Sequence, residues 1–243
     1  MYLSDIKINY LYNSGFVVET KNHLLVFDYY LDTKKECKRN IENGFLGSKE
    51  LTTAKTILVF CSHSHPDHFN SVIFSWEDFN NNISYILSSD IKEKKSNNIH
   101  YMSPYNTLKL GNTHIETFGS TDLGVSFLVN VDGISIFHAG DLNWWDWFDE
   151  SNEYNLNMEK DFKSEISKIK LNNIDVAFFP IDPRLKQSYY LGGEYFIKET
   201  KPKMFIPMHF GDNYEVTNKF ADKFKTLDCK ISTIHERGEQ LYF

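Results

Sequence analysis

The chain has 243 residues, of which 41% are hydrophobic and 16% aromatic, and its formal net charge is −7. A chain of this length can bury a sizeable core, so we expect a single domain over residues 1–243. The negative charge argues against a nucleic-acid-binding protein, and no apolar run approaches the roughly 18 residues of a membrane span. We therefore expect a small-molecule substrate, no nucleic-acid partner and no membrane insertion.

Cysteine usage and the first residues bear on the cellular compartment. Cys37, Cys61 and Cys229 are widely spaced and form no CxxC motif, so we expect no disulfide framework. The first seven residues lack the basic and then apolar layout of a signal peptide. These features favour a reducing compartment, and we predict a cytoplasmic protein, with the oligomeric state left open.

The first part of the chain is predicted to be rich in strands. Alternating or apolar runs bounded by turns predict strands over residues 6–10, 16–19, 23–28 and 56–61. Residues 29–50 are polar and lysine-bearing, so we expect a surface loop there that could cover a site. Residues 70–79 are predicted to form a short helix.

Residues 60–69 carry three imidazoles and a carboxylate within six positions: His63, His65, Asp67 and His68. In an extended segment, residues two apart project to the same side, so His63 and His65 are expected to face one point together. Asp67 and His68 are adjacent and must diverge, so they are expected to face another point after the turn. So many ionisable groups are costly to hold together unless cations coordinate them, which predicts a metal site better suited to two ions than to one.

The rest of the chain contains further strands and then strands that alternate with helices. Strands are predicted over residues 83–87, 99–102, 107–110, 114–118, 125–131, 134–141, 176–180, 204–208, 230–234 and 240–243. Apolar residues at spacings of three and four predict helices over residues 153–170, 192–200 and 216–224. This order predicts an α+β protein with a two-sheet core and helices outside.

The His63-x-His65-x-Asp67-His68 stretch matches the HxHxDH signature, and the chain resembles the metallo-β-lactamase fold superfamily. The resemblance covers nearly the whole chain and implies a four-layer αβ/βα sandwich. It also implies a metal-binding role for Asp141, at the end of an apolar strand, and for His209, after another. In this assignment the first metal is bound by His63 and His65, the second by Asp67, His68 and His209, and Asp141 bridges the two.

The chain departs from the family at one ligand. The family usually carries a third histidine for the first metal in a small Gly-His turn, and the matching residues 117–122 contain none. His138 lies three residues before Asp141, which puts the two on opposite faces of a regular strand unless Gly140 bends it. The candidates for this position, apart from water, are Ser120, Asp122, His138 and Asp146, with His138 alternatively in a supporting or core role.

The expected metal pair indicates a chemistry. Two divalent ions roughly 3.5–4 Å apart can share a hydroxide that acts as a nucleophile at neutral pH. Asp67 and Asp141 are therefore the expected catalytic residues, because Asp67 could accept a hydrogen bond or shuttle a proton beside the bridging Asp141. The nitrogen and oxygen ligands favour zinc, while manganese or iron also suits them, and one ion is an alternative to two.

The site edge is expected to include Trp145 and Arg184. Arg184 either pairs with a phosphate or carboxylate of the substrate or is a surface arginine bonded to Asp182. Asp28 ends an early strand, where such folds often place a carboxylate that supports the metal loop by hydrogen bonds. The equal alternative for Asp28 is a strand-end residue that bonds backbone amides.

Within the superfamily the chain looks most like the compact branch that includes ascorbate-phosphate lactonases and N-acyl phosphatidylethanolamine phospholipases. They share an HAGD-type strand end and a PMH-type final ligand, here residues 138–141 and 207–209. The resemblance implies a metal-dependent hydrolase of a small ester, lactone or phosphodiester. The alternatives are a non-haem iron oxidoreductase on the same fold, a nuclease, which the charge disfavours, and a metal-binding protein with a degenerate first site.

Overall fold

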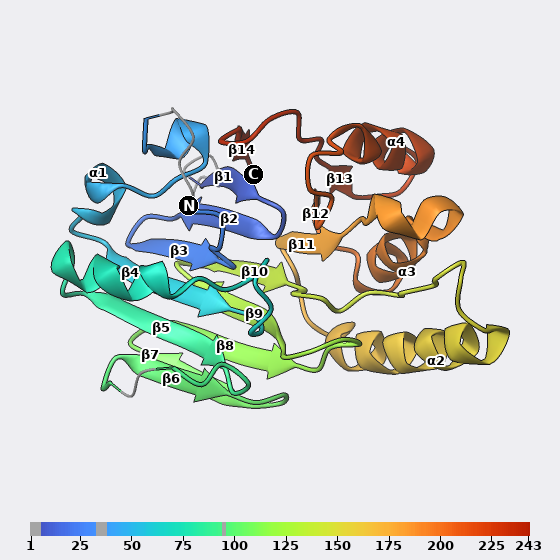
Figure 1. Ribbon diagram of the computed structural model, residues 1–243, viewed down its shortest axis with the longest axis horizontal. Helices are drawn as coiled ribbons and strands as arrows, with labels where there is room; N and C mark the ends of the chain where they lie inside the picture. Colours follow the sequence, from blue (N-terminus) through green and yellow to red (C-terminus); the bar gives the residue numbers. More distant parts are fainter. Residues whose placement is uncertain (1–5, 33–37, 94–95) are drawn as a thin grey trace. The chain divides into compact units, whose positions relative to one another are not determined.

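The computed structural model describes residues 6–32, 38–93 and 96–243, which form two compact units (Figure 1). The first unit comprises Met1–Ser103 together with His235–Phe243, and the second comprises Pro104–Ile234. Each unit contains one seven-stranded mixed sheet. The expectation of a single domain over the whole chain stays a prediction.

The sheet of the first unit has the strand order β14-β1-β2-β3-β4-β5-β6. Its strands are β1 (Lys7–Tyr12), β2 (Gly15–Glu19), β3 (His23–Phe27), β4 (Thr56–Cys61), β5 (Ile83–Ser88), β6 (Ile99–Met102) and β14 (Gln240–Tyr242). The pairs β14–β1, β1–β2 and β2–β3 are antiparallel, whereas β3 to β6 pair in parallel. The last strand, β14, therefore pairs with the first strand, β1.

The β4 strand lies inside this sheet and is buried along almost its whole length. Its apolar run is continuous because a parallel strand in the middle of a sheet is covered on both faces. Val59 belongs to a cluster that includes Trp76 of the 3₁₀ helix η3 (Ser71–Asp78), and Phe60 stacks on Phe27 with ring centroids 4.7 Å apart. The helix predicted over residues 70–79 is thus present in the tighter 3₁₀ form.

The expectation of a simple surface loop over residues 29–50 is wrong for the described part of that segment. It contains η2 (Ile41–Asn43) and α1 (Ser48–Leu51), and three of its apolar side chains are buried: Tyr29, Phe45 and Leu46. A few apolar anchors thus fix a segment that is polar on average. Residues 33–37, with Cys37 and part of the expected cover, lie outside the described residues; Cys61 and Cys229 are free thiols.

Arg237 ties this segment to the sheet of the first unit. Its guanidinium donates hydrogen bonds of 2.8–2.9 Å to the carbonyl oxygens of Leu11, Leu31 and Gly44, and it lies 4.1 Å from the ring centroid of Phe45. One side chain from the C-terminal segment therefore satisfies three backbone acceptors from distant parts of the chain.

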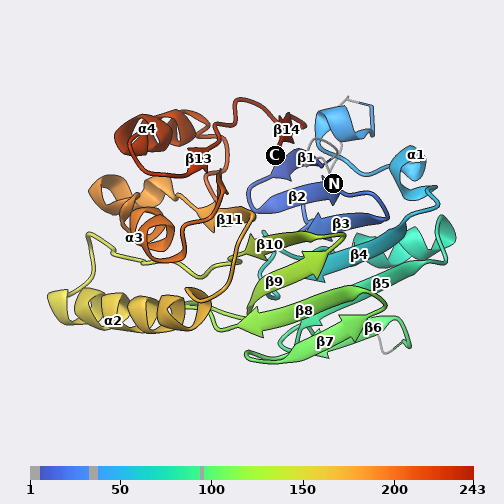
Figure 2. The ribbon, with the colours of Figure 1, turned by 180° about the vertical axis from the view of Figure 1, so that it is seen from behind.

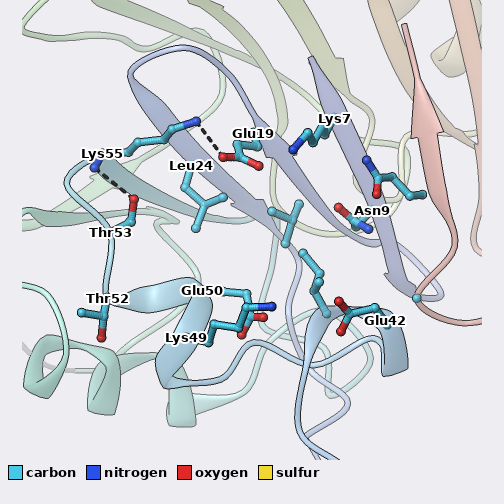
Figure 3. A pocket seen from close by; sticks show the side chains of 14 residues that line it. Lys7, Asn9, Glu19, Leu24, Glu42, Lys49, Glu50, Thr52, Thr53 and Lys55 are labelled. Atoms are coloured by element: carbon cyan, nitrogen blue, oxygen red, sulfur yellow. Dashed lines mark hydrogen bonds and ion pairs between the residues drawn. The ribbon is translucent and has the colours of Figure 1, made fainter. Parts of the chain in front are cut away.

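The first unit also contains a pocket of about 480 Å³ over the strands β14, β1, β2 and β3 (Figure 3). Asn9 and Leu24 lie on its sheet side, and Lys55 donates a 2.7 Å hydrogen bond to Glu19 at its rim. Lys55 precedes β4, so this pocket lies at the opposite end of that strand from the histidine-rich loop. Its described lining carries lysines and glutamates and includes no histidine.

The sheet of the second unit has the order β13-β12-β11-β10-β9-β8-β7 (Figure 2). Its strands are β7 (Thr107–Leu110), β8 (Thr113–Phe118), β9 (Ser126–Val131), β10 (Ile134–His138), β11 (Val176–Pro180), β12 (Met204–Met208) and β13 (Lys230–Ile231). The strands β7 to β10 form an antiparallel meander, and β10 to β13 pair in parallel. The strand expected over 134–141 ends earlier because Gly140 adopts φ +55°.

Helices α2 (Asn152–Ile169), α3 (Leu191–Thr200) and α4 (Glu215–Phe224) confirm the three helices predicted from apolar spacing. The side chain of Ser151 caps α2 by accepting the N–H of Tyr154. In α3, a Cβ added at Gly193 would come within 2.5 Å of the Ile181 side chain, so this helix needs glycine for its close approach. Among the described residues, the structure contains no helix both long and apolar enough to cross a membrane.

We predict that Arg237→Ala lowers the free energy of unfolding by about 2 kcal/mol, because three carbonyl groups lose a charged donor. Urea denaturation followed by tryptophan fluorescence measures this change. The control is Lys219→Ala, which removes an exposed pair with Glu215 on α4 and should cost no more than about 0.5 kcal/mol. Equal stabilities of the two variants would contradict the anchoring role of Arg237.

Candidate metal centre

The loop that follows β4 presents two pairs of candidate ligands, as their spacing predicts. The Nε2 atom of His63 lies 3.0 Å from Nδ1 of His65, and the two rings meet edge to face. The Nε2 atom of His68 lies 3.7 Å from the Asp67 carboxylate. Within each pair, the candidate ligand atoms lie within 4.8 Å of each other.

Asp28 holds this loop from the end of the neighbouring strand β3. It is 1% exposed, and its carboxylate accepts the backbone N–H and the hydroxyl of Ser62, each at 2.7 Å. The same carboxylate lies 2.7 Å from Nδ1 of His68. Both alternatives considered for Asp28 therefore hold, since it bonds a backbone amide and also supports a histidine. An Nδ1–H that donates to a carboxylate leaves Nε2 as the coordinating nitrogen.

Two further contacts fix the edges of the loop. The Asn13 amide donates to the Asp67 carboxylate at 3.4 Å, and the backbone N–H of Ser64 donates to Asp90 at 2.8 Å. Partial burial opposes ionisation of Asp90, but hydrogen bonds from Ser88 and Ser64 outweigh it and hold the pKa of this carboxyl below its usual value. The carboxylates of Asp28 and Asp90 therefore hold the loop, and the loop itself carries the carboxylate of Asp67.

The second unit brings Asp141 and His209 together. Asp141 follows β10 and His209 follows β12, and Nε2 of His209 lies 3.4 Å from the Asp141 carboxylate. The indole N–H of Trp145 donates to the carbonyl of Asp141 at 2.9 Å, and its ring meets that of His209 edge to face at 5.6 Å. In the structure Trp145 is therefore a buried support for both residues, and a contact between Trp145 and substrate stays a prediction.

His209 is oriented by a carboxylate in the same manner as His68. Its Nδ1 lies 3.0 Å from Asp182, and the Nε–H of Arg184 donates to both oxygens of Asp182 at 2.9–3.0 Å. Burial opposes ionisation of Asp182, but the hydrogen bonds from His209 and Arg184 prevail and hold the pKa of its carboxyl below the usual value. The bond between Arg184 and Asp182 was one of the two alternatives that the sequence left open.

Of the four candidates for the missing histidine, Asp122 lies beside Asp141, with ligand atoms within 4.8 Å. Among the described residues of this unit, no such group of candidate ligands includes His138 or Asp146. His138 is fully buried in β10, where its Nδ1 accepts the N–H of Gly140. The carboxylate of Asp146 accepts the hydroxyl of Ser188, and the hydroxyl of Ser120 accepts the N–H of Asp122.

The contact of Asp182 with His209 is one that the sequence analysis did not predict. A usable signal was present, because Asp182 comes two residues after β11 and His209 comes one residue after its parallel neighbour β12. The register pairs Pro180 with Met208, so both side chains emerge at the same edge of the sheet. Neither strand alone reveals this proximity, because it depends on their pairing.

The donor atoms present in each unit fit a divalent transition metal. The first unit offers imidazole nitrogens and one carboxylate, and the second offers an imidazole and two carboxylates. Such sets of nitrogen and oxygen donors suit zinc, iron and manganese. The carboxylates behind His68 and His209 are the outer partners that metal-binding histidines usually have.

Comparisons with known proteins point to one family. A family model described as a beta-lactamase superfamily domain matches residues 7–146. A UPF0173 metal-dependent hydrolase from Opitutus terrae is 25% identical over 234 residues, which cover 87% of each protein. The resemblance that the sequence motif suggested is therefore confirmed.

Solved structures show the same fold at low sequence identity. Igni18, a metallo hydrolase from Ignicoccus hospitalis, matches with a TM-score of 0.64 and 17% identity over 98% of each chain. CmlA, a diiron β-hydroxylase from Streptomyces venezuelae, matches with a TM-score of 0.65 and 10% identity over 99% of this chain and 54% of that one. The predicted α+β fold of the metallo-β-lactamase type is thereby confirmed.

We predict that Asp28→Ala lowers the free energy of unfolding of the metal-free protein by about 3 kcal/mol, because buried donors of Ser62 and His68 lose their acceptor. Urea denaturation in the presence of a chelator measures this change. The control Asp90→Ala removes a half-buried carboxylate after β5 that accepts the N–H of Ser64 in the same loop, and it should cost about 1 kcal/mol. A loss at Asp28 no larger than that at Asp90 would refute the anchoring role of Asp28.

Proposed function

Because the chain belongs to the beta-lactamase superfamily, we propose that it is a metal-dependent hydrolase. The proposed ligands are His63, His65, Asp67, His68, Asp141 and His209. The observation that carries this proposal occurs once in each unit: a buried carboxylate holds the Nδ1 of a histidine and leaves its Nε2 for a cation.

A bound divalent ion would polarise the bond to be cleaved and lower the pKa of a water molecule. The chain itself supplies the group that handles protons. Asp67 has a side chain that is 45% exposed, and the Asn13 amide holds its carboxylate in place. We assign Asp67 as the proton acceptor and Asp141 as a bridging ligand. Zinc is the proposed metal, and the same donors accept manganese or iron.

The proposed substrate is a small ester, lactone or phosphodiester with an anionic group. This choice is supported by Arg184, whose side chain is 62% exposed and lies 5.7 Å from the ring centroid of Trp147. A guanidinium close to the ligand His209 would attract a substrate phosphate or carboxylate. Arg184 thus has two proposed roles, because it also holds the carboxylate of Asp182.

We predict that the purified protein contains near-stoichiometric transition metal and that a chelator abolishes hydrolysis of aryl esters, lactones or phosphodiesters. Asp141→Ala should lower metal content and activity together. The loss of activity should exceed the about 10–100-fold that follows when a residue that only orients a ligand is removed. Elemental analysis and a chromogenic assay on the same samples measure both quantities.

The matched control for this experiment is Asp146→Asn, because Asp146 lies on the same loop and bonds Ser188. It should retain metal and turnover. Full activity of the metal-free protein would refute the proposed function. Bound iron with a visible absorption band and no hydrolysis would favour an iron oxidoreductase, and metal uptake without any turnover would favour a binding protein.

A further inference from the structure

The turn after β8 places a carboxylate where the family resemblance leads us to expect a histidine. In the second unit, this carboxylate of Asp122 and that of Asp141 have oxygen atoms within 4.8 Å of each other. Two like charges at this distance are unfavourable unless a cation compensates them. A cation bound beside both carboxylates would relieve this repulsion.

The backbone on both sides of Asp122 is fixed by hydrogen bonds. The N–H of Gly119 donates to Glu165 of α2 at 2.7 Å, and a Cβ added at Gly119 would lie 3.1 Å from that carboxylate. The Thr121 hydroxyl donates to the carbonyl of Asn143 at 2.6 Å and accepts its N–H at 3.0 Å. These hydrogen bonds tie the turn to the segment that follows Asp141. They keep the carboxylates of Asp122 and Asp141 close together.

The other three candidates to replace the histidine make hydrogen bonds that shape the surrounding structure. The hydroxyl of Ser120 accepts the N–H of Asp122 and so shapes the turn. His138 is buried in β10 against Phe178, and its Nδ1 accepts a backbone N–H. Asp146 is bonded to Ser188. These contacts give each of the three a structural task, whereas the carboxylate of Asp122 is placed beside a proposed ligand.

We propose that Asp122 is a metal ligand beside Asp141 and takes the place of the family's histidine. This inference rests on the proposed function and specifies the metal of that site. A carboxylate in place of an imidazole adds an oxygen donor, which suits manganese and iron. The first site should therefore discriminate less in favour of zinc than a site with three histidines.

The experiment compares the wild type with Asp122→Asn, Asp122→His and the control Asp146→Asn. Each protein is stripped with a chelator and loaded with Zn²⁺ alone, Mn²⁺ alone or an equimolar mixture of the two. Elemental analysis counts the bound ions, and electron paramagnetic resonance follows bound Mn²⁺. Thermal unfolding of the metal-free forms checks that the variants fold, which we expect because Asp122 lies on an exposed turn.

In Asp122→Asn, the affinity for one metal ion should fall at least about tenfold. The loss of a residue that only orients a metal ligand already lowers metal affinity by about that factor. In Asp122→His, the ratio of bound zinc to bound manganese should rise above that of the wild type. The control Asp146→Asn should match the wild type in both measurements. These readouts do not depend on finding the substrate.

Unchanged metal affinities in Asp122→Asn, or an unchanged zinc-to-manganese ratio in Asp122→His, would overturn the role of Asp122 and leave the proposed function intact. A wild-type protein that binds neither metal would overturn the proposed function and this inference together. The two failures are therefore distinguishable from the same set of samples.

Discussion

A buried hydrogen bond between a carboxylate and an imidazole is the interaction on which the candidate ligands of each unit depend. Asp28 holds His68 in the first unit, and Asp182 holds His209 in the second. A buried carboxylate is stable only when it is paired and fully hydrogen-bonded, and both meet this condition through additional donors. Ser62 supplies those donors to Asp28, and Arg184 supplies them to Asp182. Each histidine is thereby fixed before any cation arrives.

Parallel strand pairing produces this interaction twice from unrelated sequences. In the first unit, β3 and β4 pair with Phe27 opposite Phe60, and the carboxylate and the histidine loop follow directly. In the second unit, β11 and β12 supply Asp182 and His209 in the same way. The chain also adopts left-handed backbone angles at Asp28, with φ +43°, and at His209, with φ +62°. Such strain persists where the surrounding structure enforces it, and it often marks functional positions.

The parts of the protein that could be predicted from sequence are those encoded by short-range patterns. The strands, three helices and the grouping of His63 with His65 follow from periodicities of two and of three to four residues. The partnership of Asp182 with His209 does not follow from either strand alone, because it depends on the pairing of two strands separated by a helix. The anchoring of the described residues between 29 and 50 was missed for a similar reason: a few buried aromatic side chains and the distant Arg237 outweigh a polar average composition.

The replacement of a histidine by Asp122 would change the charge of the centre as well as its ligand type. In the proposed site, two divalent ions bring four positive charges, and Asp67, Asp122 and Asp141 together bring three negative ones. A histidine at position 122 would leave one more positive charge, which would make the ions stronger Lewis acids and favour zinc hydrolysis chemistry. The lower charge instead favours ions that prefer oxygen donors. Arg184 then gains importance, because an anionic substrate would depend more on this guanidinium and less on the metal charge.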